Sequence, residues 1–120
     1  MTPAELTAAL ADPFPPDRLG WKAQATKDNR ALAVAFIDAR DVMDRLDAVV
    51  GCSCWQSTYE PMPDGNVICH LGVRVDGEWV TKSDVGGPSD QKDTGDRCKS
   101  AFSDSLKRAA VHWGIGRYLY

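Results

Sequence analysis

The chain lacks the segments that would place a protein in a membrane or mark it for secretion. Its longest apolar run is seven residues, Ala31 to Ile37, whereas a membrane-spanning helix needs about 20. The N-terminus has no basic region followed by an apolar stretch, so it carries no recognisable secretory signal. We therefore expect a cytoplasmic protein with no membrane partner.

Motifs for nucleotide hydrolysis and metal binding are also missing. The chain has no Gly-x-x-x-x-Gly-Lys-Ser/Thr run, which argues against an ATP-driven motor. Its four cysteines include no Cys-x-x-Cys pair, and Cys52 and Cys54 would point to opposite sides of a strand. We predict free cysteines in a reducing compartment and no cofactor; zinc held by cysteines with His70 or His112 is the minor alternative.

The chain does contain enough apolar residues to form the core of one domain, and it has a local excess of positive charge. At 120 residues and 43% hydrophobic, residues 1–120 should form a single domain. Residues 97–120 hold five Lys/Arg against one acid, a balance of +4; the whole chain is −3, so residues 1–96 carry −7. This asymmetry favours a localised anion site over a generally basic surface.

The basic segment reads as a helix. Lys99, Ser103 and Lys107 are spaced by four and share one face, and Gly114 is a suitable stop. The pattern alone favours an ordinary solvated amphipathic helix over an anion site. A second face is apolar at three- and four-residue steps, comprising Phe102, Leu106, Ala109, Ala110 and Trp113.

The preceding residues predict an α+β fold built on antiparallel strands. A short helix begins near Thr2 and ends at the prolines of 12–16, and a second helix runs from Asp38 to Gly51. Between the helices, 21–26 and 31–37 form a β-hairpin with a turn at 27–30. After the second helix, 54–59, 67–75 and 78–85 form a three-stranded meander, and 86–95 is a loop.

Strict alternation marks 67–75 as a half-buried strand, with His70 and Arg74 on its mixed face. We expect Trp21 to be a core residue rather than a platform for stacked bases, and Trp79 to anchor the strand 78–85. Trp113, Tyr118 and Tyr120 should likewise pack or form an interface.

The run from Phe102 to Tyr120 resembles the signature helix of the Rad52/Rad22 family of single-strand annealing proteins, most closely its short bacterial and bacteriophage members. The closing Gly-Ile-Gly-Arg-Tyr-Leu-Tyr is a specific part of this resemblance. Upstream pieces agree in order, namely 14–16, 20–22, 46–51, 55–56 and 79–86. The resemblance implies a β-β-β-α core, in which a long C-terminal helix crosses an antiparallel sheet.

The resemblance also implies a function. Relatives anneal complementary strands in recombination and repair without ATP, as homo-oligomeric rings or helical filaments around which single-stranded DNA lies. A single-stranded DNA-binding protein is expected as a further partner. Lys107 and Arg108 match the Lys-Arg pair that relatives use on the DNA backbone, while Val111 stands where eukaryotic relatives are often basic. Position and charge add four further DNA-binding candidates, Arg74, Lys82, Lys92 and Lys99.

Two alternatives remain open. The chain resembles a DNA-damage-response branch of the same superfamily, whose members protect DNA ends or bind proteins without annealing. A metal-dependent nuclease would need acids such as Asp84, Asp90 and Asp93 to hold magnesium, but they sit in or near a glycine-containing loop without a fixed arrangement. We therefore expect a binding protein and not an enzyme.

Overall fold

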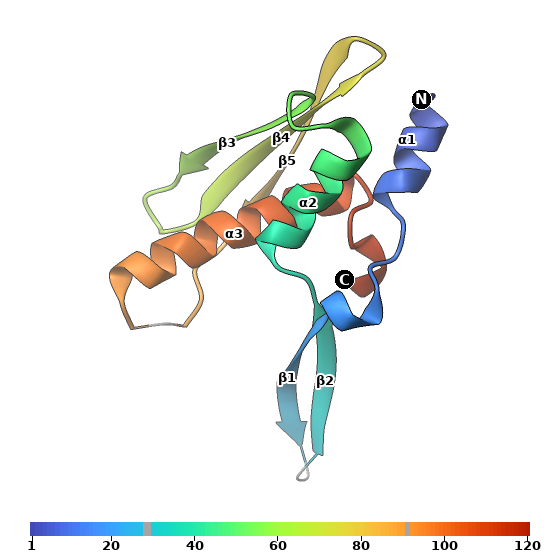
Figure 1. The fold of residues 1–120 in the computed structure, drawn as a ribbon. Helices are drawn as coiled ribbons and strands as arrows, with labels where there is room; N and C mark the ends of the chain where they lie inside the picture. Colours follow the sequence, from blue (N-terminus) through green and yellow to red (C-terminus); the bar gives the residue numbers. More distant parts are fainter. Residues whose placement is uncertain (28–29, 91) are drawn as a thin grey trace.

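The computed structural model describes residues 1–27, 30–90 and 92–120 (Figure 1). Residues 28–29 of the predicted 27–30 turn, and residue 91 of the predicted loop, lie outside this range. The elements in chain order are α1 Pro3–Leu10, the 3₁₀ turn η1 Pro16–Arg18, β1 Gly20–Lys27, β2 Arg30–Phe36, α2 Ala39–Val50, β3 Trp55–Pro61, β4 Val67–Val75, β5 Glu78–Gly86, α3 Thr94–His112 and the 3₁₀ turn η2 Arg117–Leu119.

The helices begin where side chains can satisfy their first backbone N–H groups. At α1, the Thr2 hydroxyl accepts from the Glu5 N–H at 3.1 Å and the Glu5 carboxylate accepts from the Thr2 N–H at 3.3 Å, a reciprocal cap. The helix α3 begins at Thr94, earlier than its basic segment indicated, because the Asp93 side chain caps it by accepting from Asp96 N–H. No described helix has the length and apolarity needed to cross a membrane.

The predicted α+β class is confirmed, with its strands divided between two antiparallel sheets, β1-β2 and β3-β4-β5. The long helix α3 crosses one face of the three-stranded sheet, and α2 packs against α3 (Figure 1). The β1-β2 hairpin projects away from the body on the side of α3 opposite that sheet.

The core lies between β4 and the helices α1, α2 and α3. Cys69, Leu71 and Val73 are fully buried on one face of β4, as the alternation predicted. Gly86, at the end of β5, packs directly on the backbone of Ser105 in α3, where a β-carbon would lie 2.2 Å from the Ser105 nitrogen. Only glycine therefore lets β5 and α3 approach this closely.

The prediction that Trp21 is a core residue is wrong. Trp21 is 64% exposed, because alternation along the projecting hairpin turns it to the face opposite Lys22. Trp79 is 44% exposed on the sheet face away from α3, where its ring lies beside Gly72. By contrast, Trp113 is buried as expected, and its indole N–H donates to the Leu71 carbonyl at 3.1 Å.

The four cysteines are free, as predicted. Cys52 and Cys54 both precede β3, which begins at Trp55, so the two residues do not lie on opposite sides of a strand. Cys69 is buried below Tyr59, and burial raises the pKa of its thiol to about 11.

Candidate functional site

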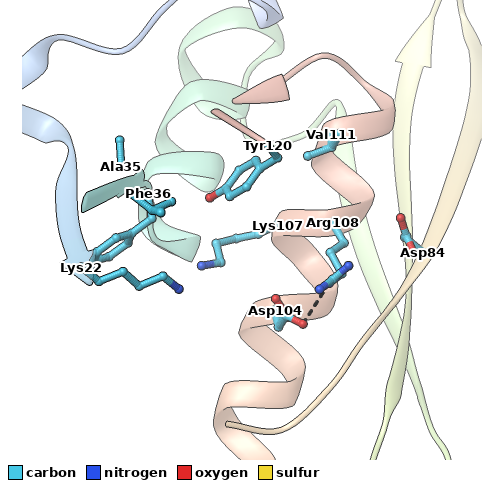
Figure 2. Close-up of a pocket in the computed structure, with 10 residues that line it drawn as sticks. Lys22, Ala35, Phe36, Asp84, Asp104, Lys107, Arg108, Val111 and Tyr120 are labelled. Atoms are coloured by element: carbon cyan, nitrogen blue, oxygen red, sulfur yellow. Dashed lines mark hydrogen bonds and ion pairs between the residues drawn. The ribbon is translucent and has the colours of Figure 1, made fainter. Parts of the chain in front are cut away.

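A cavity of about 440 Å³ separates the hairpin from α3 (Figure 2). We call it the hairpin–helix groove. One wall is the face of the hairpin that carries Lys22 and Phe36, and the other is the face of α3 that carries Lys107 and Arg108. The groove is also lined by Asp84 from β5, Asp104 from α3 and Tyr120 from the C-terminal segment.

Strand register decides which hairpin residues face the groove. Lys22 pairs with Val34 and Gly20 pairs with Phe36, so these four residues share one face. The far end of the Phe36 ring packs against Gly20, where a β-carbon would come within 2.4 Å of the ring. Glycine at this position therefore seats the aromatic ring and leaves Lys22 free to extend along it.

Lys107 reaches the same aromatic ring from the opposite wall. Its Nζ lies 5.9 Å from the Phe36 centroid, and Lys22 Nζ lies 5.5 Å from it. Burial lowers the pKa of Lys107, and the neighbouring charges of Lys22 and Arg108 add to that effect, while Asp104 opposes it. Two cations that converge in a half-buried place create a potential that an anion would relieve.

Arg108 is held by an acid one turn earlier on the helix. Its Nε donates to Asp104 Oδ2 at 3.0 Å, and the same carboxylate oxygen accepts from the Gly87 N–H at 3.0 Å. Among the described residues this is the one bond that the guanidinium makes, so its terminal nitrogens retain donors for a ligand. Asp104 thus fixes the direction of Arg108 and ties the loop after β5 to α3.

A second acid lies beside the groove. Asp84 Oδ2 is 2.9 Å from His112 Nε2. Burial acts to raise the pKa of Asp84, but hydrogen bonds from His112 and the Val85 N–H, with the nearby His112 and Arg108 charges, outweigh it and lower that pKa. Three cations, Lys22, Lys107 and Arg108, and two carboxylates, Asp84 and Asp104, line the groove and give it a balance of +1.

The structure brings together only part of the predicted site. Lys107 and Arg108 line the groove, whereas Lys82 lies in a neighbouring cavity. Lys99 is exposed. It lies on the same face of α3 as Lys107, nearer the start of the helix. Lys92 is exposed in the segment that leads into that helix.

Arg74 is exposed on the face of the three-stranded sheet away from α3. Leu71 and Val73, with which it alternates along β4, form the buried face. The carboxylates suggested for magnesium are also separated from one another in the fold: Asp84 lies on β5, while Asp90 and Asp93 follow that strand. In residues 1–27, 30–90 and 92–120, no group of three or more His, Cys, Asp or Glu side chains is arranged to hold a metal ion.

Sequence reasoning missed Lys22, Phe36 and Tyr120. The Tyr120 hydroxyl accepts from the Ile37 N–H at 3.4 Å, which ties the C-terminal segment to the base of the hairpin. The available signal was the Gly20-Trp21-Lys22 run. Its lysine could have been assigned to the groove only with the orientation of the hairpin known.

Two curated proteins match this chain along nearly its whole length. One, from Deinococcus deserti, is named single-stranded DNA-binding protein DdrA; it is 42% identical over 119 residues, which cover 98% of this chain and 57% of the relative. The other has the same name, comes from Deinococcus radiodurans, and is 38% identical over 119 residues, 98% of this chain and 55% of the relative. The chain therefore spans little more than half the length of these relatives.

A wider comparison gives the same grouping. The model of the Rad52/22 family double-strand break repair protein matches residues 2–120. Its extent includes the hairpin, the meander and α3, so both walls of the groove lie inside the match. The chain belongs to the Rad52/22 family of double-strand break repair proteins.

Proposed function

We propose that the chain binds single-stranded DNA in the hairpin–helix groove. The observation that carries this proposal is the convergence of Lys22 and Lys107 on one aromatic ring from opposite walls, with Arg108 beside them. Lysine and arginine neutralise phosphates without reading sequence. The names of the two relatives, both single-stranded DNA-binding proteins, support the same ligand class.

We further propose that binding serves the annealing of complementary strands, without ATP, in recombination and repair. An annealing protein must hold the phosphates and leave the base edges free to test a second strand, and cationic side chains on a rigid helix suit that task. Base pairing itself then supplies the driving free energy. The groove's balance of only +1 implies weak binding per copy, so a homo-oligomeric ring or filament that repeats the groove would supply the affinity.

Binding is tested with a charge-matched pair of double variants. Lys107→Ala with Arg108→Ala should weaken binding of a labelled oligothymidine at least tenfold at about 0.1 M salt and flatten the salt dependence by about 0.7 for each lost phosphate contact. Arg40→Ala with Arg74→Ala removes the same charge outside the groove and should bind like the parent. Equal binding by both double variants would refute the groove as the DNA site.

Annealing needs its own assay. The rate of pairing of two complementary oligonucleotides, measured with and without protein and without ATP, should rise, and light scattering should give the mass of an oligomer. The second candidate is strand or end protection without annealing, which the relatives' names also fit because they state binding alone. Tight strand binding with an unchanged pairing rate would establish that candidate.

A further inference from the structure

A second cavity, of about 480 Å³, lies at the C-terminal end of α3. We call it the end cavity. Residues from four parts of the chain meet there, α1, β5, the end of α3 and the C-terminal segment. The lining side chains that matter here are Thr7, Lys82, His112, Trp113, Arg117 and Tyr118.

Two cations of this cavity are brought to a single backbone oxygen. Lys82 Nζ donates to the His112 carbonyl at 3.2 Å, and Arg117 Nη2 donates to the same oxygen at 3.0 Å. Arg117 Nε also donates to the Val111 carbonyl at 2.9 Å, and Lys82 Nζ lies 4.8 Å from the Trp113 ring centroid. The last carbonyls of a helix lack intrahelical partners, so they can anchor both side chains.

This anchoring leaves positive charge and donors unused. A lysine ammonium has three N–H donors and a guanidinium five, and the bonds above occupy one and two of them. Within the described part of the chain, neither Lys82 nor Arg117 pairs with a carboxylate. The described residues that line the end cavity include no Asp or Glu, so its two permanent cations give a balance of +2, higher than that of the groove.

An aromatic side chain stands beside these cations in a fixed position. The Tyr118 hydroxyl oxygen accepts from the Phe14 N–H at 2.9 Å, while 50% of the residue remains exposed. A held, half-exposed ring is a suitable platform for a nucleobase, and base–aromatic stacking tolerates any sequence. The cavity thus combines phosphate-binding groups with a stacking surface.

The end cavity also adjoins the hairpin–helix groove. Asp84 lines the groove and His112 lines the end cavity, and these two side chains are bonded at 2.9 Å. Lys82 is two residues before Asp84 on β5, so the two side chains point to the same face of that strand. Along α3, His112 lies four positions after Arg108, a rise of about 6 Å.

We infer that the end cavity is a second phosphate subsite for the same single strand, reached past the Asp84–His112 pair and completed by a base stacked on Tyr118. This inference rests on the proposed binding of single-stranded DNA in the groove. It assigns Lys82 and Arg117 to the DNA path, which then extends from the middle of α3 to its C-terminal end.

The test compares short and long ligands on the full chain. Lys82→Gln with Arg117→Gln should bind an oligothymidine of about 20 nucleotides roughly tenfold more weakly than the parent, with the salt slope lower by about 1.4, as two lost phosphate contacts on a single strand predict. Its affinity for an oligothymidine of about 4 nucleotides, which can fill the groove alone, should change less than twofold. Arg40→Gln with Arg74→Gln is the charge-matched control, and Tyr118→Leu should weaken the long ligand without altering the slope.

The outcomes separate this inference from the proposed function. If Lys107→Ala with Arg108→Ala leaves binding of the short ligand intact, the groove itself is refuted. If that variant loses binding while Lys82→Gln with Arg117→Gln keeps the parent's salt slope, only the second subsite is refuted. Should loss of the Arg117 bonds unfold the C-terminal segment, as circular dichroism would reveal, Lys82→Gln alone must lower the slope by about 0.7, and an unchanged slope overturns the inference.

Discussion

Gly86 and Ser105 join β5 to α3 at a contact that has no room for a side chain. A β-carbon on Gly86 would lie 2.2 Å from the Ser105 nitrogen and 2.6 Å from its α-carbon, both backbone atoms inside a helix. Neither element can withdraw without disturbing the core between β4 and α3, because packed interiors transmit such shifts.

We therefore predict that Gly86→Ala lowers the free energy of unfolding by about 3 kcal/mol or more, at or above the upper end of ordinary overpacking. The neighbouring Gly87→Ala is the control. Its β-carbon would meet only the Asn66 side-chain oxygen, at 3.0 Å, which can move aside, so the loss should stay below about 1 kcal/mol. Urea unfolding of both variants checks the difference, and similar losses would contradict the contact as described.

Lys107 should show opposite effects on stability and binding. Because burial and neighbouring cations lower its pKa, its charge is a cost to the folded state. Lys107→Met is therefore expected to raise the thermal midpoint while lowering the salt slope of oligothymidine binding by about 0.7. A variant that lost stability together with binding would show that the ammonium is a structural group.

The same lowered pKa predicts a pH dependence. A lysine whose folded pKa lies below its unfolded value of 10.5 binds fewer protons when folded, so stability rises with pH between the two values. DNA affinity moves the other way, falling as pH rises through the folded pKa. Lys107→Arg keeps its charge across this range, so its affinity should stay level where the parent's falls. Parallel curves for the two proteins would exclude Lys107 as the titrating group.

Asp104→Asn should strengthen binding. The amide oxygen can still accept from the Gly87 N–H, while the loss of the carboxylate frees Arg108 and raises the charge of the groove from +1 to +2. We expect roughly a threefold to tenfold gain in affinity at low salt, shrinking as salt rises. Asp44→Asn, on the exposed side of α2, removes the same charge elsewhere and should give a smaller gain.

Arg45 should prove important for docking of α1. One of its terminal nitrogens donates to the Leu10 and Asp12 carbonyls at 2.9 and 2.6 Å, and its guanidinium lies 4.2 Å from the Phe14 ring centroid. Arg45→Lys keeps the charge but not the planar fork, so we expect a loss of about 1–2 kcal/mol in the free energy of unfolding. Arg40→Lys, on the same helix, should leave the free energy of unfolding almost unchanged. Scanning calorimetry of both variants checks the difference.

The predictable features were those encoded by neighbouring residues. The cap at Thr2 depends on a residue three positions away, the burial of Cys69, Leu71 and Val73 on a two-residue period, and the faces of α3 on a helical period. Local spacing determines such features whatever the rest of the chain does. The Lys107–Arg108 wall of the groove was predicted from the resemblance of this helix to the family's signature helix.

The other wall depends on contacts between distant segments. Lys22 faces Lys107 because β1 and β2 leave the body as a separate sheet, and nothing in the local pattern distinguishes that arrangement from a hairpin packed in the core. The same ambiguity explains the wrong prediction for Trp21. Because the hairpin projects from the body, Lys22 faces the groove and Trp21, on the opposite face, is exposed. Arg117 finds its carbonyl partners only after the chain turns at Gly114.

A consequence follows from the hairpin being a sheet of its own. Two strands alone are marginally stable in water, and this pair is anchored near its base, where the Ile37 N–H meets Tyr120. Single-stranded DNA bound between Lys22 and Lys107 would contact both the hairpin and the helix. Binding of DNA and ordering of the hairpin are therefore thermodynamically coupled. Because such coupling is reciprocal, a change that stabilises the ordered hairpin raises the affinity for DNA by the same factor by which bound DNA stabilises the hairpin.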